Sequence, residues 1–150
     1  MSEEEHRIRS KQITLNLLRS STYQTCQSIH LYKSFKDEVD TQYILHHAQK
    51  SSRDIYHPTK DPLDNEKCDI VIVPGRKFDK QMSRKGRGQG YYDKFLHSIP
   101  SLRIGLCYEM QLFEKIERKW WDMPMDLVIT EKGIYNRRTL ITFENGNWST

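Results

Sequence analysis

The spacing of hydrophobic residues predicts a helix at the start of the chain. Ser2 is followed three residues later by Glu5, which is the pattern of an N-cap with a capping box. Apolar residues then recur at helical spacing, so we expect a helix over 2–19. The residues that share or adjoin its apolar face are Ile8, Ile13, Leu15, Leu17 and Leu18. The Ser-Ser-Thr cluster at 20–22 predicts a loop after this helix.

A strand follows the loop, because residues 28–35 alternate between apolar and other side chains. Lys33 interrupts the apolar side, as happens where the end of a strand reaches a ligand cleft. The further elements expected before residue 68 are a turn at 36–39, a helix that begins at Asp40 or Thr41 and buries Ile44, Leu45 and Ala48, a short strand at 54–56, and a polar loop at 58–67.

The run from Cys68 to Val73 is apolar, β-branched and without alternation. Such a run predicts a central strand covered on both faces, as in parallel α/β sheets. The elements expected after it are a helix that begins after Gly90, strands at 102–108 and 125–130, a short helix or turn at 111–119, a turn at 131–135 and an edge strand at 139–143. Strands that alternate with helices predict an α/β fold, a three-layer sandwich with a mostly parallel, mixed sheet of Rossmann-like type.

Length and composition restrict this picture to one globular domain over residues 1–150. Hydrophobic residues make up 36% and charged residues 29%, and the formal net charge of +4 suits an anionic ligand without demanding nucleic acid. The longest apolar run, Ile70–Val73, is far below the roughly 20 residues that span a bilayer. The N-terminus is acidic and polar, unlike a signal peptide, and the three cysteines show no zinc-binding spacing. We therefore expect a cytoplasmic protein with reduced cysteines and without a membrane partner, and we expect it to be a monomer.

The segment after the central strand carries the candidate chemistry. Four of the seven glycines fall between residues 75 and 90, and seven basic residues fall between 76 and 94. A strand, a glycine-rich turn and a helix start form a common anion site, because free backbone N–H groups and the helix dipole point at the anion. The loop is neither a P-loop nor a GxGxxG fingerprint. In parallel sheets ligands bind at the carboxyl ends of strands, which lie after Phe35, Val73, Tyr108 and Thr130.

Carboxylates near this loop have more than one interpretation. Asp93 lies just inside the expected helix, where it could cap the helix or bind Mg²⁺ together with phosphate oxygens. A second metal ligand would have to come from another strand end, and the candidates are Asp122 and Asp126. Glu38 could accept N–H donors from a polar ring edge, or it could be an exposed turn residue.

The two pairs of adjacent aromatic residues also have more than one interpretation. Tyr91 and Tyr92 would place one ring in the core and one in the cleft, where it could stack on a flat heterocycle, or both could simply pack. The pair formed by Trp120 and Trp121 fits packing, or the rim of a site, better than a place in the site itself.

The central motif strongly resembles the signature of the 5-formyltetrahydrofolate cyclo-ligase family, also called 5,10-methenyltetrahydrofolate synthetases. The segments that carry the resemblance are Val73-Pro-Gly75, Phe78-Asp79, Arg84-Lys-Gly-Arg-Gly-Gln-Gly-Tyr-Tyr-Asp93, Glu38-Val-Asp-Thr41, Ile104-Gly-Leu, Gln111-Leu, Asp122-Met-Pro-Met-Asp126, Thr130-Glu131 and Gly133-Ile134. The resemblance runs from about residue 28 to residue 134, and its central motif is specific.

The resemblance implies an ATP- and Mg²⁺-dependent enzyme that converts 5-formyltetrahydrofolate to 5,10-methenyltetrahydrofolate and releases ADP and phosphate. It implies catalytic roles for Arg87 and Tyr91, and Mg²⁺ ligands at Asp93 and Asp122. The positions that correspond to ATP binding are Arg84, Lys85, Gly86, Arg87, Gly88, Gln89, Gly90, Tyr91 and Tyr92. The positions that correspond to folate binding are Lys33, Glu38, Arg87, Gly88, Gln89, Gly90 and Tyr91.

The chain departs from the family pattern in three places. Family members usually begin with an extra basic helix that contacts ATP, and this chain starts after it, so the domain is short at the N-terminus. The segment before the central strand is reduced to about 57–67, and Gln89 stands where members have Lys or Gly. One alternative is therefore a truncated, non-catalytic relative that binds folate or nucleotide. Another is RNA binding by the Arg/Gly loop, which the bracketing Asp79 and Asp93 and the lack of a broad basic face argue against.

Overall fold

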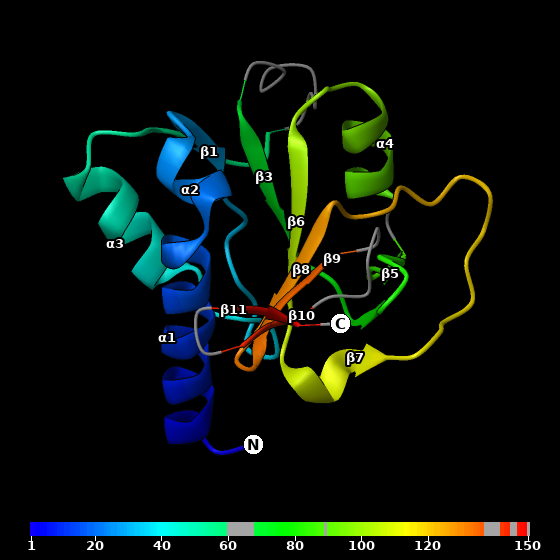
Figure 1. Cartoon of the computed structure of the whole chain (residues 1–150). Helices are drawn as coiled ribbons and strands as arrows, with labels where there is room; N and C mark the ends of the chain where they lie inside the picture. The colour runs from blue at the N-terminus through cyan, green and yellow to red at the C-terminus, as the bar shows by residue number, and fades with distance from the viewer. Residues whose placement is uncertain (60–67, 89, 137–141, 145–146, 150) are drawn as a thin grey trace.

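The computed structural model describes residues 1–59, 68–88, 90–136, 142–144 and 147–149, and an eight-stranded sheet forms its centre (Figure 1). The strands of this sheet are β1 (Ser28–His30), β2 (Asp54–Tyr56), β3 (Ile70–Val73), β6 (Leu102–Leu106), β8 (Leu127–Thr130), β9 (Gly133–Asn136), β10 (Thr142–Glu144) and β11 (Asn147–Ser149). Their order is β11-β10-β9-β8-β6-β3-β1-β2. The five strands from β2 to β8 are parallel, and β9, β10 and β11 continue the sheet antiparallel.

Helices cover both faces of the sheet (Figure 1). The helices are α1 (Glu3–Arg19), α2 (Ser21–Thr25), α3 (Gln42–Lys50) and α4 (Tyr91–His97), with a 3-10 turn η2 at Glu109–Gln111. The first three helices lie on one side of β3 and β6, and α4 lies on the other. The structure therefore confirms a three-layer α/β sandwich with a mostly parallel, mixed sheet. None of the described helices combines the length and apolar character that a membrane span needs.

The central strand β3 is buried on both faces, as its sequence predicts. Ile70 and Ile72 belong to the hydrophobic cluster beneath α1 and α3. Val71 and Val73 belong to the cluster on the other face, which includes Phe95 of α4. Because both faces are covered, every position of the strand can be apolar, and no alternation appears in the sequence.

Helix α1 begins where expected, but its buried face differs from the expected one. The Ser2 hydroxyl caps the helix by accepting a hydrogen bond from the Glu5 amide at 3.1 Å. The residues buried on α1 are Ser10, Ile13, Thr14 and Leu17, whereas Ile8 and Leu15 are 45% and 48% exposed. The buried hydroxyls are bonded: Thr14 donates to the Ser10 carbonyl at 2.8 Å, and Ser10 Oγ accepts from the Asp40 amide at 3.0 Å.

Several local expectations are wrong or incomplete. The loop expected at 20–22 is largely helical, because Ser20 caps α2 by accepting from the Tyr23 amide at 3.2 Å. The strand expected over 28–35 ends at His30. The reversal expected at 131–135 is a hairpin whose second arm is β9. Residues 60–67 of the expected polar loop and 139–141 of the expected edge strand lie outside the described residues.

The helix or turn expected at 111–119 is not formed: residues 112–113 are instead a strand of a second, three-stranded sheet. It consists of β4 (Lys77–Asp79), β5 (Arg84–Lys85) and β7 (Leu112–Phe113) in the order β5-β4-β7. The β4–β5 hairpin carries the basic end of the glycine-rich loop. This small sheet therefore fixes that loop against the segment that follows β6.

Met82, in the turn between β4 and β5, has φ of 69° although it is not glycine, and its side chain is fully buried. We predict that Met82→Gly is more stable than Met82→Ala by about 1 kcal/mol, because alanine retains the strain of the left-handed conformation. Both variants lose the buried methionine, at a cost of about 2–5 kcal/mol. Urea unfolding midpoints would measure the difference.

The matched control for the Met82 pair is Gln12, an exposed residue inside α1. There the order should reverse, with Gln12→Ala more stable than Gln12→Gly, because glycine weakens a helix interior by roughly 0.5–1 kcal/mol. An alanine variant that is more stable than glycine at both positions would show that Met82 carries no backbone strain.

Candidate functional site

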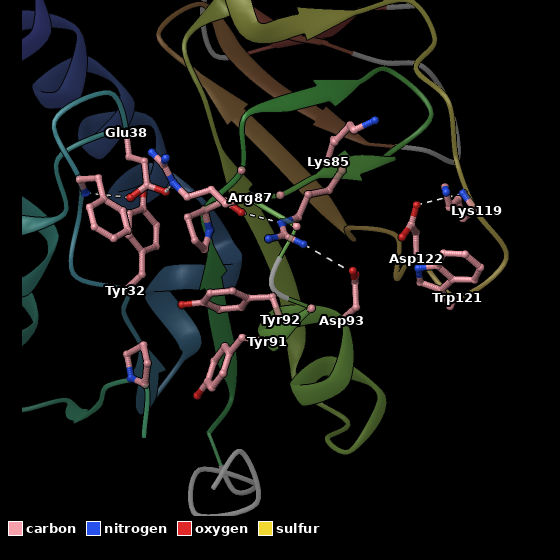
Figure 2. Close-up of a pocket in the computed structure, with 18 of the residues that line it drawn as sticks. Tyr32, Glu38, Lys85, Arg87, Tyr91, Tyr92, Asp93, Lys119, Trp121 and Asp122 are labelled. Carbon is pink, nitrogen blue, oxygen red and sulfur yellow. Dashed lines mark hydrogen bonds and ion pairs between the residues drawn. The ribbon is translucent and has the colours of Figure 1, made fainter. Parts of the chain in front are cut away.

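A cavity of about 550 Å³ opens beyond the carboxyl ends of β1 and β3 (Figure 2). One wall comes from the segment after β1, with Tyr32, Lys33, Phe35 and Glu38. The floor comes from Pro74 and Gly75 after β3, from residues 84–88 and Gly90 of the loop, and from Tyr91, Tyr92 and Asp93 of α4. The far wall includes Glu117, Lys119, Trp121 and Asp122. The cavity thus collects all the expected site residues that the structure describes, and Gln89 lies outside the described residues.

Arg84 is buried beneath the loop and organises it. Its Nε donates to the Pro74 carbonyl at 2.6 Å, and its guanidinium lies 3.7 Å from Asp93 Oδ1 and 5.4 Å from the centre of the Tyr92 ring. Burial lowers the pKa of this guanidinium, and the negative charge of Asp93 opposes that shift. The arginine therefore connects the end of β3 to the start of α4.

Glycines are required around Arg84 for two different reasons. A Cβ on Gly86 would lie 2.5 Å from an Arg84 guanidinium nitrogen, and one on Gly75 would lie 2.8 Å from the Phe78 ring. Gly88 and Gly90 instead have φ of 89° and 71°, which side-chain-bearing residues rarely adopt. Close packing thus explains the first two glycines, and backbone conformation explains the other two.

Arg87 joins the loop to the segment after β1. Its guanidinium pairs with Asp37, lies 3.7 Å from Glu38 Oε2, and covers the Phe35 ring at 4.7 Å. Glu38 is buried, and its Oε1 accepts from the Phe35 amide at 2.8 Å. The interpretation of Glu38 as an exposed turn residue is therefore wrong.

Helix α1 helps to position the backbone of Glu38. The His6 Nε2 lies 2.7 Å from the Glu38 carbonyl oxygen, and the Tyr108 hydroxyl donates to the same oxygen at 3.4 Å. The Tyr32 hydroxyl donates to the next carbonyl, that of Val39, at 2.9 Å. The Glu38 carboxylate is consequently held in a fixed place at one end of the cavity.

Two carboxylates stand at the other end of the cavity (Figure 2). Asp93 is the third residue of α4, and its Oδ1 accepts from the Met123 amide at 3.4 Å. Asp122 also lines the cavity, and its Oδ2 accepts from the Lys119 amide at 2.9 Å. The other candidate, Asp126, is not among the lining residues and instead accepts from the Arg103 amide at 2.8 Å.

The two aspartates are compatible with Mg²⁺. No cluster of three or more His, Cys, Asp or Glu side chains suited to a metal occurs in the part of the chain that the structure describes. Mg²⁺, however, is usually held by one or two carboxylates together with water and phosphate oxygens. The hydrogen bonds and the ion pair given above use Oδ1 of Asp93 and Oδ2 of Asp122, so each carboxylate has a second oxygen that could face an ion.

Both tyrosines of α4 line the cavity, so the expected division into one core ring and one cleft ring is wrong. Their rings make an edge contact at 5.1 Å. The Tyr91 hydroxyl accepts from the Thr59 amide at 3.3 Å. The Tyr92 hydroxyl is buried without a hydrogen-bond partner among the described residues, and burial raises its pKa.

Two features of the site were not predicted from the sequence. Asp79 is fully buried, and it accepts from the Gln81, Ser83 and Ile116 amides at 2.8–3.0 Å, which ties the loop to the far wall. Its position directly after a strand and before a polar turn was a usable signal, because aspartate often bonds to amides of a following turn. Among the far-wall residues, Trp121 was expected only as a packing or rim residue, and Glu117 and Lys119 had no comparable signal.

The strand ends after Tyr108 and Thr130 do not line the cavity, contrary to expectation. Their polar residues bind one another instead. The Glu109 amide donates to Glu131 at 2.7 Å, and the Thr130 hydroxyl donates to Glu109 at 2.7 Å. Arg9 of α1 also pairs with Glu131 at 3.0 Å. This edge of the sheet therefore anchors α1 rather than a ligand.

Comparisons with known proteins agree with this geometry. A family model described as the 5-formyltetrahydrofolate cyclo-ligase family matches residues 58–131. The chain is 25% identical to the 5-formyltetrahydrofolate cyclo-ligase of Mus musculus, over 87% of this chain and 86% of the mouse protein. It is 22% identical to the protein of the same name from Escherichia coli strain K12, over 72% of this chain and 80% of that one.

A solved structure of Aquifex aeolicus 5,10-methenyltetrahydrofolate synthetase matches with a TM-score of 0.82 and 28% identity. The match covers 92% of this chain and 86% of the Aquifex chain. Fold, central motif and relatives thus converge, and the chain resembles the 5-formyltetrahydrofolate cyclo-ligases in sequence and in structure.

Proposed function

We propose that the protein is an ATP- and Mg²⁺-dependent 5-formyltetrahydrofolate cyclo-ligase. It would convert 5-formyltetrahydrofolate and ATP to 5,10-methenyltetrahydrofolate, ADP and phosphate. The observation that carries the proposal is that one cavity holds a buried carboxylate, Glu38, at one end, the basic glycine-rich loop in the middle, and Asp93 and Asp122 at the other end.

The Glu38 end suits the folate. A pterin ring presents N–H donors along one edge, and a fixed, buried carboxylate can accept them. Glu38 is held by the Phe35 amide and by contacts from α1, so little side-chain freedom remains to be lost on binding. Lys33 and Tyr91, which line the same cavity, would flank the bound folate.

The loop suits the transferred phosphoryl group. In the proposed reaction the formyl oxygen attacks the γ-phosphorus of ATP and ADP leaves. The folate N10 then attacks the activated carbon, and phosphate departs as the ring closes. A formyl oxygen is a weak nucleophile, so the γ-phosphate must be held in line with its charge neutralised. Arg84, Lys85 and Arg87 would supply that charge, and the glycines would let backbone N–H groups approach.

Asp93 and Asp122 would hold the Mg²⁺ ion that accompanies ATP. When bound, this ion supplies positive charge to the phosphate oxygens. Asp93 also pairs with Arg84, so the proposed metal ligand lies beside a buried cation at the start of α4.

The proposal predicts that the purified protein, mixed with 5-formyltetrahydrofolate and MgATP, produces the near-ultraviolet absorbance of the methenyl product. Omission of ATP, or chelation of Mg²⁺ with EDTA, should abolish the signal. Tight folate binding without product in the complete mixture would contradict the proposal and would support a non-catalytic relative.

Asp93→Asn keeps the shape of the side chain but removes its charge. Because a metal ligand is lost, we expect turnover at limiting Mg²⁺ to fall about 100-fold, with partial recovery at high Mg²⁺. Asp126→Asn is the control, since Asp126 lies outside the cavity lining. Turnover measured against Mg²⁺ concentration, with circular dichroism to verify folding, tests this expectation. An unchanged Mg²⁺ dependence would exclude Asp93 as a ligand.

Arg87→Ala should mainly raise the apparent KM for ATP or for folate, by roughly tenfold, because a charge-assisted contact is lost. Arg76→Ala is the matched control, because Arg76 is exposed and is not part of the cavity lining. Steady-state kinetics with each substrate varied in turn would show the effect. If both arginine variants keep the wild-type constants, Arg87 does not belong to the site.

A further inference from the structure

Most of the far wall of the cavity belongs to a four-residue turn, Lys119–Asp122, which two hydrogen bonds close. The Asp122 amide donates to the Lys119 carbonyl at 3.0 Å, and Asp122 Oδ2 accepts from the Lys119 amide at 2.9 Å. Within this turn Lys119, Trp121 and Asp122 line the cavity. The turn is thus an ordered part of the wall, and the two central residues project from a fixed backbone.

The two tryptophans of this turn differ sharply in environment. Trp120 is 90% exposed and is not part of the cavity lining, whereas Trp121 is 44% exposed and lines the cavity. The Lys119 Nζ lies 5.2 Å from the centre of the Trp121 ring. The Trp121 carbonyl accepts from His97 Nε2 of α4 at 3.1 Å, so the turn is attached to the helix that carries Asp93.

We propose that the Trp121 indole is the surface on which the nucleobase of the bound nucleotide stacks, with the Lys119 ammonium beside it. This inference rests on the proposed function, in which Asp93 and Asp122 bind the Mg²⁺ ion that accompanies the phosphates of ATP. Glu38 stands at the opposite side of the cavity from Trp121, with Arg87 between the two sides (Figure 2). With the pterin at Glu38 and the phosphates over the loop, the base of the nucleotide falls at the Trp121 end.

Stacking on an indole is tolerant of base identity, because every base has a π face. The Trp121 carbonyl, a group that could read a base edge, is already used by His97. The wall should therefore supply affinity for purine nucleotides in general, rather than discrimination between adenine and guanine.

The test compares Trp121→Leu with its neighbour Trp120→Leu in equilibrium binding, measured by calorimetry with Mg²⁺. The probes are adenylyl imidodiphosphate, its guanylyl counterpart, inorganic tripolyphosphate and 5-formyltetrahydrofolate. In Trp121→Leu we expect about a tenfold rise in Kd for both nucleotides, about 1.4 kcal/mol, with tripolyphosphate and folate unchanged. Trp120→Leu should bind all four probes like the wild type, and Trp121→Phe should recover part of the loss.

Three results would overturn the proposal: equal effects of the two leucine variants, equal weakening of tripolyphosphate, or weaker folate binding with unchanged nucleotide binding. The binding assay needs no turnover, so it separates the two claims. If the wild-type protein turns over and Trp121→Leu keeps its nucleotide affinity, the proposed activity stands and base stacking on Trp121 is rejected. If nucleotide binding depends on Trp121 but no methenyl product forms, base stacking stands and the proposed activity is rejected. A wild-type protein that binds no nucleotide would reject both claims.

Discussion

The buried guanidinium of Arg84 is the interaction on which the site depends. It bonds to the carbonyl that ends the central strand segment, faces the first carboxylate of α4, and lies under the ring of Tyr92. A buried cation is costly unless it is paired, so these contacts must form together. A Cβ on Gly86 would collide with this guanidinium, so the loop passes close to the arginine at a glycine.

Two further contacts extend this arrangement across the cavity. Arg87 ties the loop to Asp37 and Glu38, and Asp79 ties the loop to the far wall through the Ile116 amide. In the proposed arrangement, the pairing of Arg87 with Glu38 places one cation between the folate and the phosphates. A folate that engages Glu38 must rearrange this contact, which would free Arg87 to meet the phosphoryl group in the proposed reaction.

Sequence patterns could predict the layers, the central strand and the glycine-rich loop, because each depends on neighbours in the chain. They could not predict the buried face of α1, since the buried Ser10 hydroxyl is bonded to the Asp40 amide and the Tyr108 hydroxyl, which are distant in the chain. They also could not choose between Asp122 and Asp126, four residues apart on one irregular segment. That choice depends on the 119–122 turn and on the Arg103 amide that engages Asp126. Trp121 likewise differs from Trp120 only through the direction of this turn.

The parallel sheet has a consequence for how the cavity forms. The central pairings join residues far apart in the chain: β1 pairs with β3 across about forty residues, and β3 pairs with β6 across about thirty. Such non-local pairing is slow to form, and the cavity walls lie on the loops that these strands carry. The cavity should therefore be completed late in folding. A ligand would then slow unfolding and raise stability by mass action, while leaving the refolding rate nearly unchanged.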